Sequence, residues 1–172
     1  MKYLLAAVLT GAMVAPAHAQ VAGSARDGQP TPIEGSQRHV VTATKSPARY
    51  QVDVLRVDST VVPLPAGFKL PVIYVLDGNS LFPLAAQMAN VSTSFSSRLP
   101  AVLVVSIGHP TDPALSRAEN VEENLARRTS DLAPPAADFL AFFKNDLEPF
   151  IAARYPVDRS DQTLAGHSWC GL

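Results

Sequence analysis

The sequence contains a single cysteine, Cys170, among its 172 residues. One cysteine cannot form an internal disulfide framework, and it excludes a cysteine-rich zinc site. Charge is scarce and balanced, because 14 basic and 15 acidic residues give a formal net charge of −1. This balance gives no electrostatic reason to expect nucleic acid or an anionic membrane as a partner. No His, Asp and Glu cluster has metal-ligand spacing, so we predict no metal and no cofactor.

Long apolar runs are also rare, and the one candidate lies at the N-terminus. Met1-Lys2 precedes an apolar run over residues 3–15. Ala17-His18-Ala19 then places small residues at the two positions that a signal peptidase recognises before its cleavage site. The run is short for a transmembrane anchor, and Pro16 interrupts it. We therefore predict a signal peptide over residues 1–19 with cleavage after Ala19, no later membrane span, and a bacterial periplasmic or secreted protein.

The mature chain divides into two parts by composition. Residues 20–36 are rich in Gly, Pro, Ser and Gln, which predicts a flexible leader. Residues 37–172 have enough apolar content for a packed core, and they contain no internal repeat. The length is that of one domain or a large part of one.

Apolar patterning in residues 37–172 predicts alternating strands and helices. Short β-branched runs predict strands over residues 39–44, 50–57, 71–76, 101–107 and 163–165. Helical spacing appears at residues 80–89 and again after Pro134-Pro135, where Phe139, Leu140, Phe143, Leu147, Phe150 and Ile151 form a core-facing stripe. Pro149 should kink this second helix or begin its last turn. The alternation predicts an α/β fold with a mostly parallel sheet and flanking helices.

The last predicted strand runs into Gly166-His167-Ser168, the beginning of a nucleophile elbow with the pattern G-x-S-x-G. In such an elbow the serine occupies a strained strand-to-helix turn, and small residues two positions before and after it avoid crowding the backbone. Here Cys170 occupies the second glycine position, with Gly171 displaced by one. The alternative is that Ser168 only ends a strand in a turn.

Four segments resemble the α/β-hydrolase esterases, in the group that contains the periplasmic enterobactin and salmochelin siderophore esterases and the esterase D-like enzymes. The segments cover residues 72–82, 104–110, 127–134 and 139–168, and they occur in the order of the family. The resemblance implies the N-terminal part of an α/β-hydrolase fold that ends at the elbow, C-terminally truncated with the later strands missing.

The resemblance implies a serine ester hydrolase mechanism with Ser168 as the nucleophile that forms an acyl-enzyme. The oxyanion would be bound by the backbone amide of Trp169 and by that of Gly78 or Asn79 in the loop after residues 71–76. The other interpretation of Asp77-Gly78 is a simple strand-end turn. Cys170 is interpreted as a packing residue, since no sequence signal points to a reactive thiol.

A further implied site residue is Arg128, in a segment that resembles the family's Arg-x-x-Asp-Leu-Thr-Pro. It would bind an anionic or polyphenolic substrate. Arg127 is adjacent, and Ala133 replaces the usual threonine. Asp131 is interpreted as an acceptor that fixes a loop rather than as a catalytic acid.

The acid and the histidine of a triad should follow the serine in this fold, but only four residues follow Ser168. The mature histidines, His39, His109 and His167, all precede it, so none is expected to be the base. We therefore expect poor folding and no ester turnover if these residues are the entire product. The predicted function is a serine carboxylic-ester hydrolase acting on a small-molecule ester, with a siderophore lactone as candidate. The alternative is a catalytically dead remnant or a non-enzymatic binding domain built on the loops around Asp77 and Arg128.

Overall fold

The computed structural model describes residues 32–95 and 100–171. The predicted signal peptide and residues 20–31 of the predicted leader lie outside the described residues. The remaining leader residues contain a hydrogen-bonded turn, in which the amide of Ser36 donates to the carbonyl of Ile33 at 3.1 Å. Ile33 also packs against one of the two core clusters, so the domain begins slightly before its first strand.

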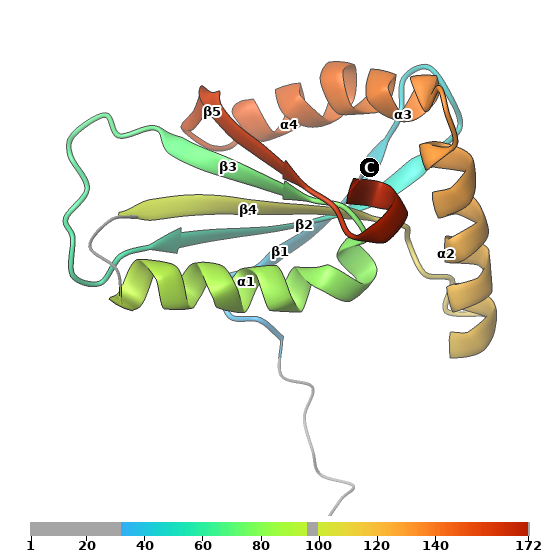
Figure 1. Ribbon diagram of the computed structural model, residues 1–172, viewed down its shortest axis with the longest axis horizontal. Helices are drawn as coiled ribbons and strands as arrows, with labels where there is room; N and C mark the ends of the chain where they lie inside the picture. Colours follow the sequence, from blue (N-terminus) through green and yellow to red (C-terminus); the bar gives the residue numbers. More distant parts are fainter. Residues whose placement is uncertain (1–31, 96–99, 172) are drawn as a thin grey trace, which may run out of the picture. The chain divides into compact units, whose positions relative to one another are not determined.

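A single sheet of five strands forms the centre of the described residues, in the order β1-β2-β4-β3-β5 (Figure 1). The strands are β1 (Gln37–Thr42), β2 (Arg49–Asp58), β3 (Leu70–Val75), β4 (Ala101–Gly108) and β5 (Val157–Ala165). Strand β3 pairs in parallel with both β4 and β5, whereas β1 and β2 extend the sheet through antiparallel pairing. The predicted α/β class is confirmed, with a mixed sheet whose parallel part is β4-β3-β5.

The continuous apolar runs belong to the strands that are covered on both faces. All eight residues of β4 are buried, which explains why its sequence lacks the alternation of a half-exposed strand. The last strand is longer than the predicted residues 163–165, because β5 begins at Val157. Its polar N-terminal half carries little apolar signal, and β5 lies at the edge of the described sheet.

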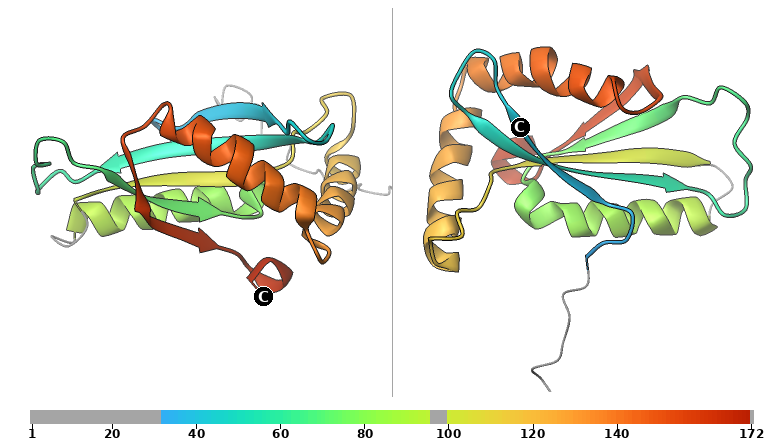
Figure 2. Two further views of the ribbon diagram at one scale, coloured as in Figure 1. Left: turned by 90° about the horizontal axis from the view of Figure 1, so that it is seen from above. Right: turned by 180° about the vertical axis from the view of Figure 1, so that it is seen from behind.

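Helices cover the sheet on both faces (Figures 1 and 2). On one face lies α1 (Gly78–Phe95), which buries Phe82, Ala86 and Ala89 against β2, β3 and β4. On the other face lie α3 (Ala137–Phe142), the π-helical turn η1 (Phe143–Leu147) and α4 (Glu148–Ala152), which form one continuous helical segment. This second layer contains the larger core cluster.

The predicted aromatic stripe packs as expected, with one exception. Phe139, Phe143, Leu147 and Ile151 are buried and Phe150 is partly buried against the same core, but Leu140 is 54% exposed. Pro149 lacks an amide hydrogen, so the helical hydrogen-bond pattern is interrupted there and the turn before it is π-helical (η1). The Glu148 amide therefore donates to the carbonyl of Phe143, five residues earlier.

One helix, α2 (Arg117–Leu132), was not predicted. None of its residues is buried, so it carries no strong apolar stripe. Its N-terminus is set by a capping box, in which Ser116 and Glu119 exchange side-chain and backbone hydrogen bonds. A short 3-10 turn, η2 (Ser168–Gly171), follows β5. Within residues 32–95 and 100–171, no helix combines the length and the apolar character that a bilayer span requires.

Candidate active site

The loops after the parallel strands meet at one edge of the sheet. The amide of Leu76, just after β3, donates to the carbonyl of Ala165 at the end of β5 at 2.9 Å. The chain segments that begin at Asp77 and at Gly166 therefore start from neighbouring positions. In open α/β sheets this carboxyl edge of the strands is the usual place for a ligand site.

The backbone at Ser168 adopts the left-handed conformation, with φ of +57°. This conformation is unfavourable for a residue with a side chain, and it occurs mostly at functional sites and tight turns. Gly166 lets the turn close, because a Cβ at this position would lie 1.9 Å from the carbonyl oxygen of Cys170. Trp169 and Cys170 therefore do not prevent a tight turn, which depends most on the glycine at position 166.

The loop after β3 is equally tight. Asp77 is also left-handed, with φ of +57°, and its carbonyl accepts hydrogen bonds from the amides of Ser80 and Leu81. A Cβ at Gly78 would lie 2.7 Å from Oγ of Ser106, so only glycine fits. Among the described residues no acceptor is found for the amides of Gly78 and Asn79, which begin α1. Unpaired amides at a helix N-terminus are suited to bind negative charge.

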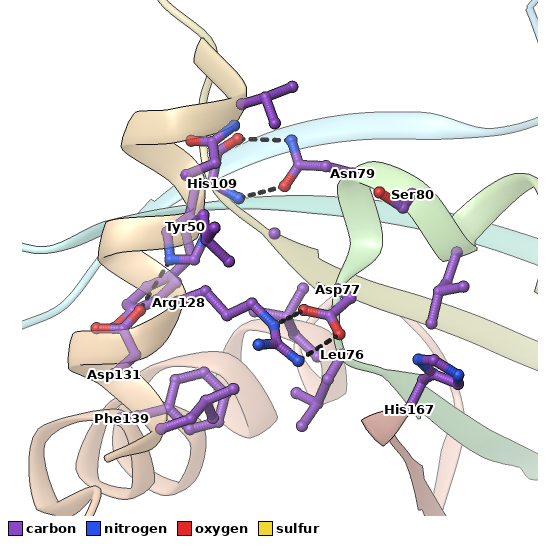
Figure 3. Close-up of a pocket in the computed structure, with 17 residues that line it drawn as sticks. Tyr50, Leu76, Asp77, Asn79, Ser80, His109, Arg128, Asp131, Phe139 and His167 are labelled. Carbon is purple, nitrogen blue, oxygen red and sulfur yellow. Dashed lines mark hydrogen bonds and ion pairs between the residues drawn. The ribbon is translucent and has the colours of Figure 1, made fainter. Parts of the chain in front are cut away.

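The side chain of Asn79 connects this loop to the loop after β4. Its Nδ2 donates to the carbonyl of His109 at 2.8 Å, and its Oδ1 accepts from the amide of His109 at 2.7 Å (Figure 3). Gly108 makes the approach possible, because a Cβ there would lie 2.2 Å from Oδ1 of Asn79. The two hydrogen bonds fix the position of the loop that carries the unpaired amides.

Arg128 contacts the same loop from α2. Its Nε donates to Oδ1 of Asp77 at 2.6 Å, and its Nη2 donates to Oδ2 at 3.2 Å (Figure 3). Nη2 also lies 2.9 Å from Sγ of Cys170, and that thiol donates to Oδ2 of Asp77 at 3.1 Å. The hydrogen bond to Asp77 raises the pKa of Arg128. Burial first, and then the hydrogen bond and the charge of Asp77, raise the pKa of the Cys170 thiol to about 11.

A second polar pair lies beside this group. Nε2 of His109 is 2.9 Å from Oδ2 of Asp131, which belongs to the last turn of α2 rather than to a loop. The ring of Tyr50 lies 5.8 Å from that of His109, measured between centroids. Burial, then the charge of Asp131, raises the pKa of Tyr50 above its ordinary value. The pairing of His109 with Asp131 was not foreseen, since the two residues are distant in the sequence.

A cleft of about 380 Å³ opens between these elements. Its polar lining includes Asp77, Asn79, Arg128 and His167, and its apolar lining comes largely from Leu76, Leu81, Ile107, Val121, Leu125, Leu132 and Phe139. Of the predicted site residues, Asn79 and Arg128 therefore line the cleft. Ser168 and Gly78 are not among the residues that line it, although Ser168 directly follows His167. No group of three or more potential metal ligands occurs within residues 32–95 and 100–171.

Comparison with known proteins agrees with this geometry. The family model described as "Putative esterase" matches residues 58–172. The siderophore triacetylfusarinine C esterase of Aspergillus fumigatus is 35% identical over 114 residues, which are 60% of this chain and 37% of that protein. The ferri-bacillibactin esterase BesA of Bacillus subtilis is 29% identical over 154 residues, which are 81% of this chain and 52% of that protein. The chain thus spans about half or less of the length of these relatives.

Solved structures share the fold. The BES protein from Bacillus cereus superimposes with a TM-score of 0.65 at 24% identity, covering 83% of this chain and 55% of that one. The siderophore hydrolase EstB from Aspergillus nidulans gives a TM-score of 0.68 at 24% identity, covering 83% of this chain and 52% of that one. These likenesses confirm the α/β-hydrolase fold. Because the family model covers most of the chain, the protein belongs to the esterase family that this model describes.

Proposed function

We propose that this chain carries the nucleophile and the oxyanion-binding loop of a serine carboxylic-ester hydrolase. One observation supports this most directly. The strained turn at Ser168 and the loop whose Gly78 and Asn79 amides have no acceptor among the described residues follow neighbouring parallel strands. A nucleophile and oxyanion donors on adjacent strand ends are what acyl transfer requires.

In this mechanism Oγ of Ser168 attacks the ester carbonyl carbon, and the alcohol leaves to give an acyl-enzyme. The carbonyl oxygen becomes negative in the transition state. The amides of Trp169 and of Gly78 or Asn79 would donate hydrogen bonds to it, and the N-terminal dipole of α1 would add to the stabilisation. Loss of one such donor costs about a hundredfold or more in turnover in serine hydrolases.

The base that removes the proton from Ser168 is proposed to lie outside these residues. In the described part of the chain, no histidine ring is hydrogen-bonded to this hydroxyl, and the ring of His109 is paired with Asp131. The partial coverage of the relatives supports the same proposal. The chain by itself is then expected to hydrolyse esters poorly.

The proposed substrate is a siderophore ester or lactone, since the two relatives are named as esterases of siderophores. The cleft has the volume of a small-molecule site and an apolar wall with a few polar groups, which fits an ester with an extended acyl part. A periplasmic or secreted location, as the sequence of residues 1–19 predicts, is part of the same proposal.

A boronic acid tests the site without requiring turnover. A serine hydroxyl beside an oxyanion site adds to the trigonal boron and turns it tetrahedral, which boron NMR detects. We expect an adduct with the unmodified chain and none with Ser168→Ala. Ser160→Ala is the matched control, because the hydroxyl of this β5 serine hydrogen-bonds only to Asp158 among the described residues.

Equal adduct formation by Ser168→Ala and the unmodified chain would contradict Ser168 as the nucleophile. Hydrolysis of a simple aryl ester, measured in parallel, tests the position of the base. Rapid turnover that is lost in Ser168→Ala would support the nucleophile and would overturn the placement of the base outside the chain.

A further inference from the structure

The contacts of Arg128 join three elements that are distant in the sequence. The guanidinium comes from α2, Asp77 comes from the loop after β3, and Cys170 comes from η2 after β5. Each of the three side chains is hydrogen-bonded to the other two. The triangle therefore spans the site from the proposed oxyanion loop to the turn of the proposed nucleophile.

The positions within this triangle are close to the proposed reacting groups. Asp77 immediately precedes Gly78 and Asn79, whose amides are unpaired among the described residues. Cys170 is two residues after Ser168. A change in the Asp77–Cys170 separation would therefore change the separation between the oxyanion donors and the nucleophile.

Hydrogen bonds to the protein hold two of the three guanidinium nitrogens of Arg128. Its Nε and Nη2 both donate hydrogen bonds to the carboxylate of Asp77, and Nη2 also donates to Sγ of Cys170. The side chains of Arg128 and Asp77 are each only 21% exposed, so solvent screens the pair less than a surface ion pair. A two-point contact between a guanidinium and a carboxylate also fixes orientation, which a single contact would not.

We propose that Arg128, Asp77 and Cys170 form a positioning network that holds the turn of Ser168 against the oxyanion loop, so that Arg128 orients the site rather than binding the substrate's charge. The role in catalysis rests on the proposed esterase function. The network itself does not, which allows the two to be tested separately.

The single cysteine provides a direct readout of the network. Thiolate formation at Cys170 can be followed through the rate at which iodoacetamide alkylates it at increasing pH, because the thiolate is the nucleophile and the chain has no other thiol. Asp77→Asn removes the negative charge that favours the protonated thiol, so the titration midpoint should fall. Arg128→Gln removes a cation that stabilises the thiolate, so the midpoint should rise. Opposite shifts are the signature of a shared network.

Arg127→Gln is the matched control, because the neighbouring arginine is paired with Glu123 on the same helix. It should leave the midpoint where the unmodified chain has it. If Asp77→Asn and Arg128→Gln both titrate like the unmodified chain, the network is overturned, whatever Ser168 does. This result would leave the proposed esterase function standing.

Adduct formation with a neutral boronic acid then tests the positioning role. We expect Arg128→Gln and Asp77→Asn to weaken the adduct about tenfold or more, since small displacements of reacting groups are costly. Cys170→Ser keeps a donor toward Asp77 and should retain the adduct better than Cys170→Ala. The dissociation constant of benzoate, a simple anionic probe, should be unchanged by Arg128→Gln.

Two outcomes would overturn the positioning role. If Arg128→Gln weakens benzoate binding and leaves the boronate adduct intact, Arg128 binds substrate charge instead. If the unmodified chain forms no adduct although the thiol titration shows the opposite shifts, the proposed function fails and the network is structural only. Circular dichroism of each variant identifies those that fail to fold, and Arg128→Lys then replaces Arg128→Gln.

Discussion

Asn79 and His109 exchange two hydrogen bonds, side chain to backbone, across a separation of thirty residues in the chain. Both distances are below 3 Å, at 2.8 and 2.7 Å. The pair resembles two residues of neighbouring strands, with the amide group of Asn79 taking the place of a peptide unit. The loop that contains the unpaired amides is therefore tied to the end of β4.

Replacement of Asn79 by alanine should remove both bonds while keeping the backbone amide at this position. We expect the free energy of unfolding to fall by about 1 to 2 kcal/mol, since each partly exposed bond contributes modestly. Urea denaturation measures this change. Asn79→Asp keeps the acceptor for the amide of His109 and should lose less, whereas equal stability of Asn79→Ala and the unmodified chain would contradict the role of the pair.

Gly166→Ala should be strongly destabilising, because its Cβ would lie 1.9 Å from the carbonyl oxygen of Cys170. We expect a loss of about 2 kcal/mol or more in the free energy of unfolding, as for other substitutions that force the backbone to move. Gly67→Ala is the comparison, because Gly67 has φ of +73° and open space around it. Strain without a clash should cost about 1 kcal/mol there. The reverse ranking of the two variants would show that the turn is looser than described.

Ser168→Gly should stabilise the fold while removing the proposed nucleophile. Glycine adopts positive φ without a penalty, so relief of the +57° backbone at this position should add about 1 kcal/mol. Ser168→Ala loses the same hydroxyl without relieving the backbone. Thermal denaturation of the two variants separates the effects, and a higher melting temperature for the alanine variant would be evidence against a strained turn.

Phe142→Ala should cost about 3 to 5 kcal/mol, the usual loss for a large aromatic core side chain. Phe142 is buried and its ring stacks on Tyr50 with 4.0 Å between centroids. Leu140→Ala, two residues earlier on α3, should change stability by less than about 0.5 kcal/mol because Leu140 is exposed. Similar losses for the two variants would contradict the direction in which this helical layer faces.

The stability of the domain should decrease at alkaline pH. Burial, followed by the charge of Glu148, raises the pKa of Tyr74 to about 12, whereas an unfolded tyrosine titrates near 10. The folded state therefore keeps a proton that the unfolded state releases, and the free energy of unfolding falls as pH rises from about 10 to about 12. In Tyr74→Phe this contribution is absent, so the slope over that window should be shallower. An unchanged slope would assign the pH dependence to other groups.

The central strands and the two covering helices were predictable because their apolar residues follow the periods of buried structure. Strands β3 and β4 are continuous apolar runs, and Phe139 to Ile151 recur at helical spacing. Helix α2 was missed because it buries no residue, although the capping box formed by Ser116 and Glu119 was visible in the sequence. A search for this signal would have shown where the helix begins.

The site was only partly predictable for a different reason. The strand-turn motif at Ser168 is local, so it could be recognised from adjacent residues. The partner of Arg128 could not be recognised in this way, because Asp77 is 51 residues away in the sequence. Seen alone, either charged side chain could equally bind a ligand. The pairing of His109 with Asp131 likewise depends on where α2 ends. Such contacts are decided by tertiary packing, which the local sequence does not encode.

Helix α2, which buries none of its residues, is held to the domain by the ion pair of Arg128 with Asp77 and by the contact of Asp131 with His109. Its amide hydrogens should therefore exchange with solvent much faster than those of β4, whose residues are all buried. Val121 and Leu125, 60% and 57% exposed, form the wall that this helix contributes to the cleft. Local opening of α2 should therefore expose this wall of the cleft while the sheet beneath it stays folded.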